Sequence, residues 1–188
     1  KMWDAFYYMN LLKKEKYAVD TEQLRVFFPY EQTLYGMFRV YERIFGLKIV
    51  AATAPYKWNN QVTLHLVYDA ATGNPLGALY LDMFPRDGKY NHFAMFPLIS
   101  GKRLPDGAYQ RPTVALICNF PTPGKDKPSL LSHDNVETLF HEFGHALHGI
   151  LTQTKYTRFA GTSVPRDFVE APSQMLENWI WDKTVLDS

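Results

Sequence analysis

The segment His141-Glu142-Phe143-Gly144-His145 places two histidines and a glutamate at a spacing that can support chemistry. Positions i and i+4 of an α-helix lie on one face, so both imidazoles can reach one metal ion. Glu142 lies about 100° further round the helix, near a water molecule on that ion but out of line with the ligand pair. Two neutral imidazoles and one proton-accepting carboxylate are what zinc-dependent hydrolysis requires.

The residues around this motif predict the helix that would position it. Apolar residues recur at intervals of three and four from position 135 to 151, and no proline occurs from 129 to 152. Ser132 is the expected N-cap. The apolar residues cover most of the circumference, so the helix should be buried. A core helix with two hydrogen-bonded histidines is one interpretation, but we favour a metal site because two adjacent buried imidazoles need partners.

A catalytic zinc ion usually has three protein ligands and one open position, so a further ligand is needed. A second expected helix, with Pro165 in its first turn, carries Glu170 among apolar residues. A glutamate in such a place is costly unless it is paired, protonated or bound to a metal. A salt bridge to Arg158 or Arg166 is the alternative, and spacing alone does not distinguish Glu170 from Glu177 as the ligand.

Several motifs resemble, in the same order, those of the thimet oligopeptidase, neurolysin and oligopeptidase A family. The motifs are Trp3-Asp4 with Tyr7-Tyr8, residues 81–90 with His92, residues 119–120, residues 132–145, and Gly161-Thr162 followed by residues 166–179. In that family the third ligand is the glutamate of the Asp-Phe-Val-Glu segment, here Glu170. The resemblance implies a zinc-dependent endopeptidase that cleaves short peptides, with one Zn²⁺ per chain bound by His141, His145 and Glu170.

Within this site, Glu142 is expected to act as the general base that takes a proton from the zinc-bound water and passes it to the departing amine. Gly161 would let a substrate backbone approach because it has no side chain, and Thr162 beside it is the other expected substrate-binding residue. Asp167 could orient a ligand histidine. A favourable charge at a helix N-terminus explains Asp167 equally well.

The resemblance also has departures, because family members are several times longer than these 188 residues. They carry a mostly helical region before the matching part and further helices after it. We therefore expect residues 1–188 to be a partial catalytic domain of a larger, mostly helical, zincin-like peptidase, without its N- and C-terminal parts. The alternatives are a non-catalytic zinc-binding fragment and a metal-free interaction module. Glu142 favours catalysis, because a structural zinc site needs no such carboxylate.

The order of expected elements predicts an α+β fold, with a small, mostly antiparallel sheet packed with the active-site helices. Residues 1–46 are expected to be helical, residues 47–119 to form the sheet, and residues 129–188 to form the zinc-site helices. The expected strands are residues 63–68, 76–84, 91–99 and 113–119. The segment from His92 to Leu98 is the expected edge strand, which would bind substrate as an added strand.

Composition excludes some classes of function. The net charge of +1, from 20 basic and 19 acidic residues, gives no indication of nucleic-acid or charged-membrane binding. No run of about 18 apolar residues predicts a membrane span. The single cysteine, Cys118, excludes an internal disulfide and indicates a reducing, cytoplasmic location. The first expected helix carries Trp3, Phe6, Tyr7 and Tyr8 on several faces, which indicates contacts with polypeptide outside these residues.

Overall fold

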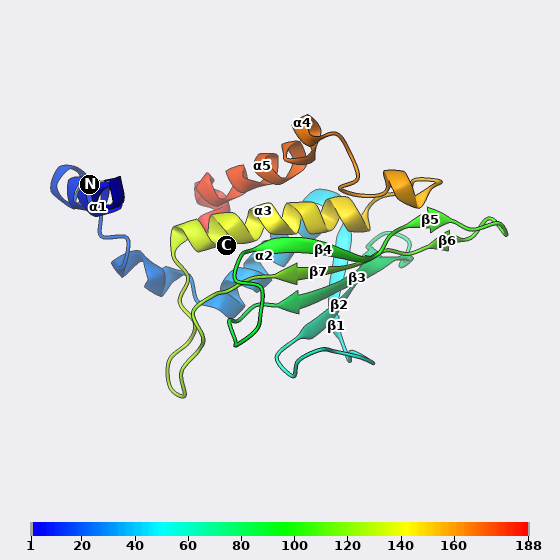
Figure 1. The fold of residues 1–188 in the computed structure, drawn as a ribbon, viewed down its shortest axis with the longest axis horizontal. Helices are drawn as coiled ribbons and strands as arrows, with labels where there is room; N and C mark the ends of the chain where they lie inside the picture. The colour runs from blue at the N-terminus through cyan, green and yellow to red at the C-terminus, as the bar shows by residue number, and fades with distance from the viewer. Residues whose placement is uncertain (1, 188) are drawn as a thin grey trace.

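A five-stranded sheet organises the computed structural model, which describes residues 2–187 (Figure 1). In spatial order its strands are β1 (Leu47–Ala52), β2 (Thr63–Asp69), β3 (Pro75–Asp82), β7 (Thr113–Ile117) and β4 (Ala94–Ile99). Only β3 and β7 pair in parallel; the other neighbours are antiparallel. A separate ribbon pairs β5 (Lys102–Arg103) with β6 (Tyr109–Gln110). The α+β prediction with a mostly antiparallel sheet is therefore confirmed, and β4 lies at one edge.

Helices occur in the sequence both before and after the strands of this sheet. They are α1 (Ala5–Tyr17), α2 (Tyr30–Phe45), α3 (His133–Ile150), α4 (Arg166–Val169), α5 (Ala171–Glu177) and α6 (Lys183–Leu186). Short 3-10 helices are η1 (Met2–Asp4), η2 (Gln23–Phe27), η3 (Thr157–Phe159) and η4 (Asn178–Trp181). Helix α3 packs between the strands β3, β7 and β4 on one side and α5 on the other (Figure 1).

The long helix α3 forms where the sequence predicts it. The Ser132 hydroxyl accepts a hydrogen bond from the Asn135 amide at 3.1 Å, and the Asn135 side chain accepts one from the Ser132 amide at 3.2 Å. This reciprocal cap satisfies backbone groups that an uncapped helix leaves open. The buried side of α3 meets α2 and the sheet in the core. Its most deeply buried side chains are Leu139, Phe143, Ala146, Leu147 and Ile150.

The expected single helix after Pro165 is wrong, because the chain forms α4, α5 and η4 in succession. Pro165 is the N-cap of α4 and does not lie in its first turn. Glu170 is the C-cap residue of α4 and also the N-cap residue of α5. Pro172 lies in the first turn of α5. Proline has no amide hydrogen to continue the backbone hydrogen bonds of the preceding turn. Glu170 consequently lies at a bend in the chain.

A buried charge network fixes the end of β3 and the loop that leads to β4. Asp82, with 1% of its surface exposed, accepts two hydrogen bonds from Arg86 at 2.7 and 2.8 Å and one from the Trp58 indole at 2.7 Å. Lys89 lies 3.0 Å from Asp82 and also donates to the Cys118 carbonyl at 2.6 Å. Burial alone would raise the pKa of Asp82, but Arg86, Trp58 and Lys89 lower it to about 2.

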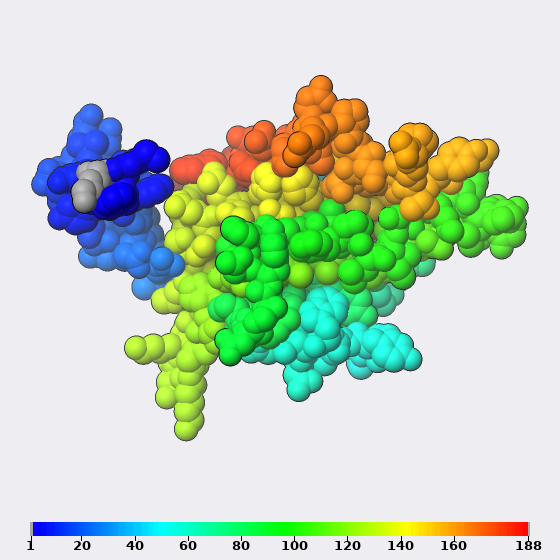
Figure 2. All heavy atoms as spheres, in the orientation of Figure 1, coloured from blue at the N-terminus to red at the C-terminus, as the bar shows by residue number. Residues whose placement is uncertain are grey.

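Helix α1 lies apart from this core. Figure 2 shows it, in dark blue, as a lobe beside the main body, and none of its residues is buried. Trp3 is 73% exposed and Phe6 is 77% exposed. These exposures agree with the expectation that the aromatic residues of this segment contact other polypeptide. No helix within residues 2–187 combines the length and apolar character that crossing a membrane requires.

Candidate metal centre

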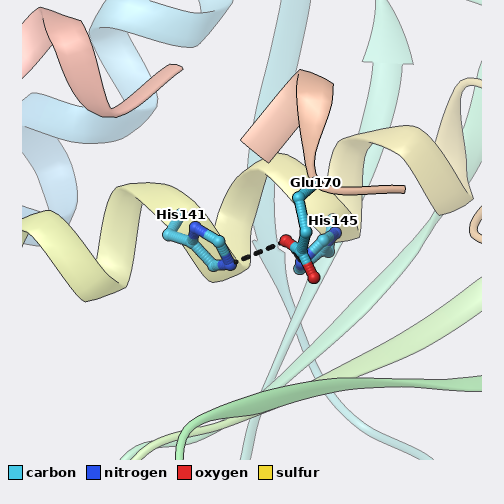
Figure 3. Close-up of side chains that lie close together, drawn as sticks. All are labelled: His141, His145 and Glu170. Atoms are coloured by element: carbon cyan, nitrogen blue, oxygen red, sulfur yellow. Dashed lines mark ion pairs between the residues drawn. The ribbon is translucent and has the colours of Figure 1, made fainter. Parts of the chain in front are cut away.

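His141, His145 and Glu170 converge on one point beside α3 (Figure 3). The two histidines come from successive turns of α3, and Glu170 comes from the bend between α4 and α5. Oε2 of Glu170 lies 3.2 Å from Nε2 of His141 and 3.0 Å from Nε2 of His145. One ligand atom from each of the three residues lies within 4.8 Å of the others.

A fourth side chain determines which nitrogen of His141 is available. Nδ1 of His141 lies 2.5 Å from Oε1 of Glu177, at the end of α5. Since Glu177 can only accept when ionised, His141 donates from Nδ1. In the neutral imidazole, the Nε2 atom then presents a lone pair towards Glu170. This is the tautomer that a metal-ligating histidine needs.

These atoms fit a zinc ion. Ligand atoms about 2.1 Å from a tetrahedral zinc ion lie about 3.4 Å from one another. The distances of 3.2 and 3.0 Å from Glu170 to the two Nε2 atoms are close to that separation. Since Nδ1 of His141 donates to Glu177, the Nε2 lone pair of a neutral His141 faces Oε2 of Glu170, and a cation between these two atoms would remove their repulsion. Two histidines and one glutamate are also a donor set that suits zinc.

The environment of Glu142 suits proton transfer. Burial of the carboxyl group raises the pKa of Glu142 above its ordinary value of 4.5. The neighbouring His141 and a backbone hydrogen bond from Met95 of β4 act in the opposite direction. A carboxylate with a raised pKa binds a proton more readily near neutral pH, as a general base must.

His145 and Glu170 have the charge states that metal ligands would need. Burial lowers the pKa of His145 below its ordinary value of 6.5, so the imidazole is neutral at pH 7. Burial would raise the pKa of Glu170, but a hydrogen bond from Ser173 and the two nearby histidines lower it below 4.5. Glu170 is therefore ionised at neutral pH.

The other predicted site residues are not among the three that converge. Asp167 is exposed in the first turn of α4 and, over residues 2–187, makes no hydrogen bond or ion pair with a histidine. Gly161 is buried with φ of 56°, and an added Cβ would lie 2.9 Å from Cα of Gly149 in α3. Close packing and a left-handed backbone thus explain this glycine without a substrate. Thr162 is partly buried and lines a small cavity that also includes Met95 of β4.

Glu177 is the residue whose contact the sequence did not predict. It was a candidate ligand, yet the structure places it against the outer nitrogen of His141. The spacing of seven residues from Glu170 to Glu177 corresponds to two helical turns, which was the available signal. The short segment that begins at Glu170, the candidate third ligand, therefore also brings the carboxylate of Glu177 to α3.

A helix with the pattern H-E-x-x-H beside the edge strand of a small sheet, with a glutamate from a following helix, is typical of metallopeptidases. Comparison with known proteins agrees. The chain belongs to peptidase family M3, whose family model matches residues 1–188. It is 43% identical to the Thimet-like oligopeptidase of Dictyostelium discoideum over 98% of the chain and 28% of that protein.

Two further relatives have similar coverage. The chain is 44% identical to Saccharolysin of Saccharomyces cerevisiae, over 98% of the chain and 27% of that protein. It is 40% identical to Oligopeptidase A of Escherichia coli, again over 98% of the chain and 27% of the relative. The chain therefore spans little more than a quarter of the length of these relatives.

Proposed function

We propose that these residues form the zinc-binding part of a metalloendopeptidase that hydrolyses short peptides. The observation that carries the proposal is that Oε2 of Glu170 lies within hydrogen-bonding distance of both Nε2 of His141 and Nε2 of His145. Membership of peptidase family M3 and relatives named as oligopeptidases support it. The proposed cofactor is one Zn²⁺ per chain, held by these three side chains.

The residues of this chain would divide the chemistry between them. A bound zinc ion would supply Lewis acidity to a water molecule and to the scissile carbonyl group. Glu142 would accept a proton from the water and return it to the departing amine, since its pKa is raised by burial. Glu177 would hold the His141 ring in place through Nδ1. The role of Asp167 would then be limited to its charge at the start of α4.

Strand β4 offers a place for the substrate backbone. It is an edge strand, it pairs with β7 alone among residues 2–187, and its residue Met95 contacts Glu142. A peptide that adds to this edge as a further strand would run beside the metal centre. Gly161 and Thr162 would border the same path, since they share a small cavity with Met95.

The proposed activity belongs to the full-length protein, meaning a polypeptide as long as the relatives. The chain covers about 27% of such a polypeptide, so additional N- and C-terminal parts would complete the substrate cleft. The short chain by itself would be a zinc-binding fragment with little or no activity. The proposed location is cytoplasmic, because the one cysteine, Cys118, is buried and free.

The test compares metal content and peptide cleavage of the full-length protein. We expect about one zinc per polypeptide, loss of activity with a chelator, and recovery on adding zinc. Glu142→Gln should retain zinc but lower the rate of cleavage of a fluorogenic peptide by about 10²–10⁴-fold. Asp126→Asn, the same change of acid to amide in an exposed loop, is the control and should behave as the wild type.

Two results would contradict the proposal. Wild-type protein that binds no zinc would contradict the proposal that zinc is the cofactor. A Glu142→Gln variant with more than about a tenth of wild-type activity would contradict the proposed role of Glu142 as general base. Zinc binding without cleavage of any peptide would favour the alternative of a non-catalytic zinc-binding module.

A further inference from the structure

Ser173 is one of three buried polar residues within residues 2–187, and its side chain points to the metal centre. It is 0% exposed and lies in the first turn of α5. Its hydroxyl oxygen lies 2.9 Å from Oε2 of Glu170 and 3.0 Å from the Glu170 carbonyl oxygen. Oε2 is the same atom that faces the Nε2 atoms of His141 and His145. The hydroxyl group therefore contacts the atom on which the ligand set converges.

The hydroxyl group has one hydrogen and two possible acceptors. The Glu170 carbonyl oxygen already accepts a backbone hydrogen bond from Gln174 at 2.9 Å. The Glu170 carboxylate makes no capping hydrogen bond to the α5 backbone. An ionised carboxylate is also a stronger acceptor than a peptide carbonyl. The Ser173 hydroxyl group therefore donates its hydrogen bond to Oε2 of Glu170 in preference to the carbonyl oxygen.

The position of Ser173 is fixed by α3. An added Cβ on Gly144 would lie 2.8 Å from Cα of Ser173, closer than real side-chain contacts allow. The two helices thus touch at their backbones at this point. Gly144 directly precedes the ligand His145, so this contact sets the distance between the ligands on α3 and the ligand at the start of α5.

We propose that Ser173 is a positioning residue for the third metal ligand. Its hydroxyl group holds the Glu170 carboxylate in the orientation that faces both histidines. The inference rests on the zinc site proposed above. A ligand that is already oriented loses less freedom when the metal binds, and groups that hydrogen-bond to metal ligands raise metal affinity in this way.

A purely structural role for the same hydroxyl group makes a different prediction. Serine side chains in a helix often donate to the carbonyl three or four residues earlier. If Ser173 served only the Glu170 carbonyl, its removal would change helix stability and leave metal affinity unchanged. Zinc affinity and the stability of the metal-free protein therefore have to be measured separately.

The experiment is Ser173→Ala in the full-length protein, with zinc affinity measured by competition against a fluorescent chelator. We expect affinity to fall by about 10–100-fold, with thermal unfolding of the metal-free protein unchanged. Ser129→Ala is the matched control. Ser129 is also buried, and its hydroxyl makes no hydrogen bond within residues 2–187, so zinc affinity should be unchanged.

A double-mutant comparison shows whether Ser173 acts through Glu170. In a Glu170→Ala background, Ser173→Ala should change zinc affinity by less than about twofold, because the partner is gone. Three results would overturn the inference: wild-type zinc affinity in Ser173→Ala, an equal loss in the Glu170→Ala background, or a metal-free Ser173→Ala protein that unfolds more easily. Wild-type protein that binds no zinc would instead refute the proposed function and this inference with it.

Discussion

Glu177 holds the ring of His141 from the side opposite the metal centre, with Oε1 and Nδ1 2.5 Å apart. The contact joins the end of α5 to the middle of α3. Ser173, in the first turn of α5, donates a hydrogen bond to Glu170, so each end of this short helix holds one of the candidate ligands. The seven residues of α5 therefore contact two of the three side chains of the candidate metal centre.

Removing the carboxylate of Glu177 should loosen His141. We expect Glu177→Ala to weaken zinc binding by about 10–100-fold, because the ring loses the partner that fixes its tautomer and orientation. Asp167→Ala is the control and should keep wild-type affinity, since Asp167 is exposed and, within residues 2–187, makes no hydrogen bond or ion pair with either histidine. Chelator competition on the full-length protein measures both. A larger loss in Asp167→Ala would show that the wrong carboxylate was chosen.

The Asp82 network should make the fold sensitive to acid. The pKa of Asp82 is about 2 in the folded state and 3.8 ordinarily, so its stabilisation is complete above about pH 4 and is lost as the pH falls towards 2. A shift of this size corresponds to roughly 2 kcal/mol. Urea unfolding of the chain between pH 2 and 7 measures it.

The matching substitution tests the same network at neutral pH. Asp82→Asn leaves Arg86 and Lys89 without their carboxylate, and we expect a loss of roughly 3–5 kcal/mol in the free energy of unfolding. Asp126→Asn, in an exposed loop, should change it by less than about 0.5 kcal/mol. Equal stability of the two variants would show that the buried charges contribute nothing.

The contact between Gly144 and Ser173 predicts a difference between two glycines. Gly144→Ala should push α5 away from α3, lower the free energy of unfolding by about 1–3 kcal/mol and weaken zinc binding. Gly36→Ala in α2 is the control, because an added Cβ meets nothing within 4 Å there. It should be neutral or slightly stabilising. Denaturant unfolding and zinc competition measure both variants. Equal stability and equal zinc affinity of Gly144→Ala and Gly36→Ala would show that the contact between Gly144 and Ser173 is unimportant.

The exposure of α1 predicts that its aromatic residues contribute little to the chain alone. Phe6→Ala should change the free energy of unfolding of the 188-residue chain by less than about 0.5 kcal/mol. Phe143→Ala, in the core, should cost about 3–5 kcal/mol. In the full-length protein the cost of Phe6→Ala should grow to more than about 1 kcal/mol as α1 gains contacts. An unchanged small cost there would contradict the expected neighbour.

The part of the site that could be predicted from the sequence lies on α3. Its apolar spacing and its cap at Ser132 are local features, so the helix and the common face of His141 and His145 follow directly. Glu170 needed the family resemblance, because spacing alone left Glu177 equally eligible. The break at Glu170 went unpredicted because the apolar pattern continues past Pro172.

Contacts between distant segments were harder to predict. The position of Glu177 against His141 depends on how closely α5 approaches α3, and that distance is set by Gly144 and Ser173 across 29 residues of chain. The parallel pairing of β3 with β7 is likewise a long-range arrangement. Alternation along each strand predicts its faces but not its partner.

The strand order has a consequence for how the chain assembles. Strand β4 is synthesised before β7, yet its only partner in the sheet is β7. It joins the rest of the sheet only through residues 113–117, which pair with β3. Joining this edge, which borders the candidate metal centre, to the rest of the sheet therefore depends on pairs such as Ala78 with Thr113. These partners lie much further apart in the sequence than those of the hairpin of β2 and β3, and contacts between distant residues form more slowly.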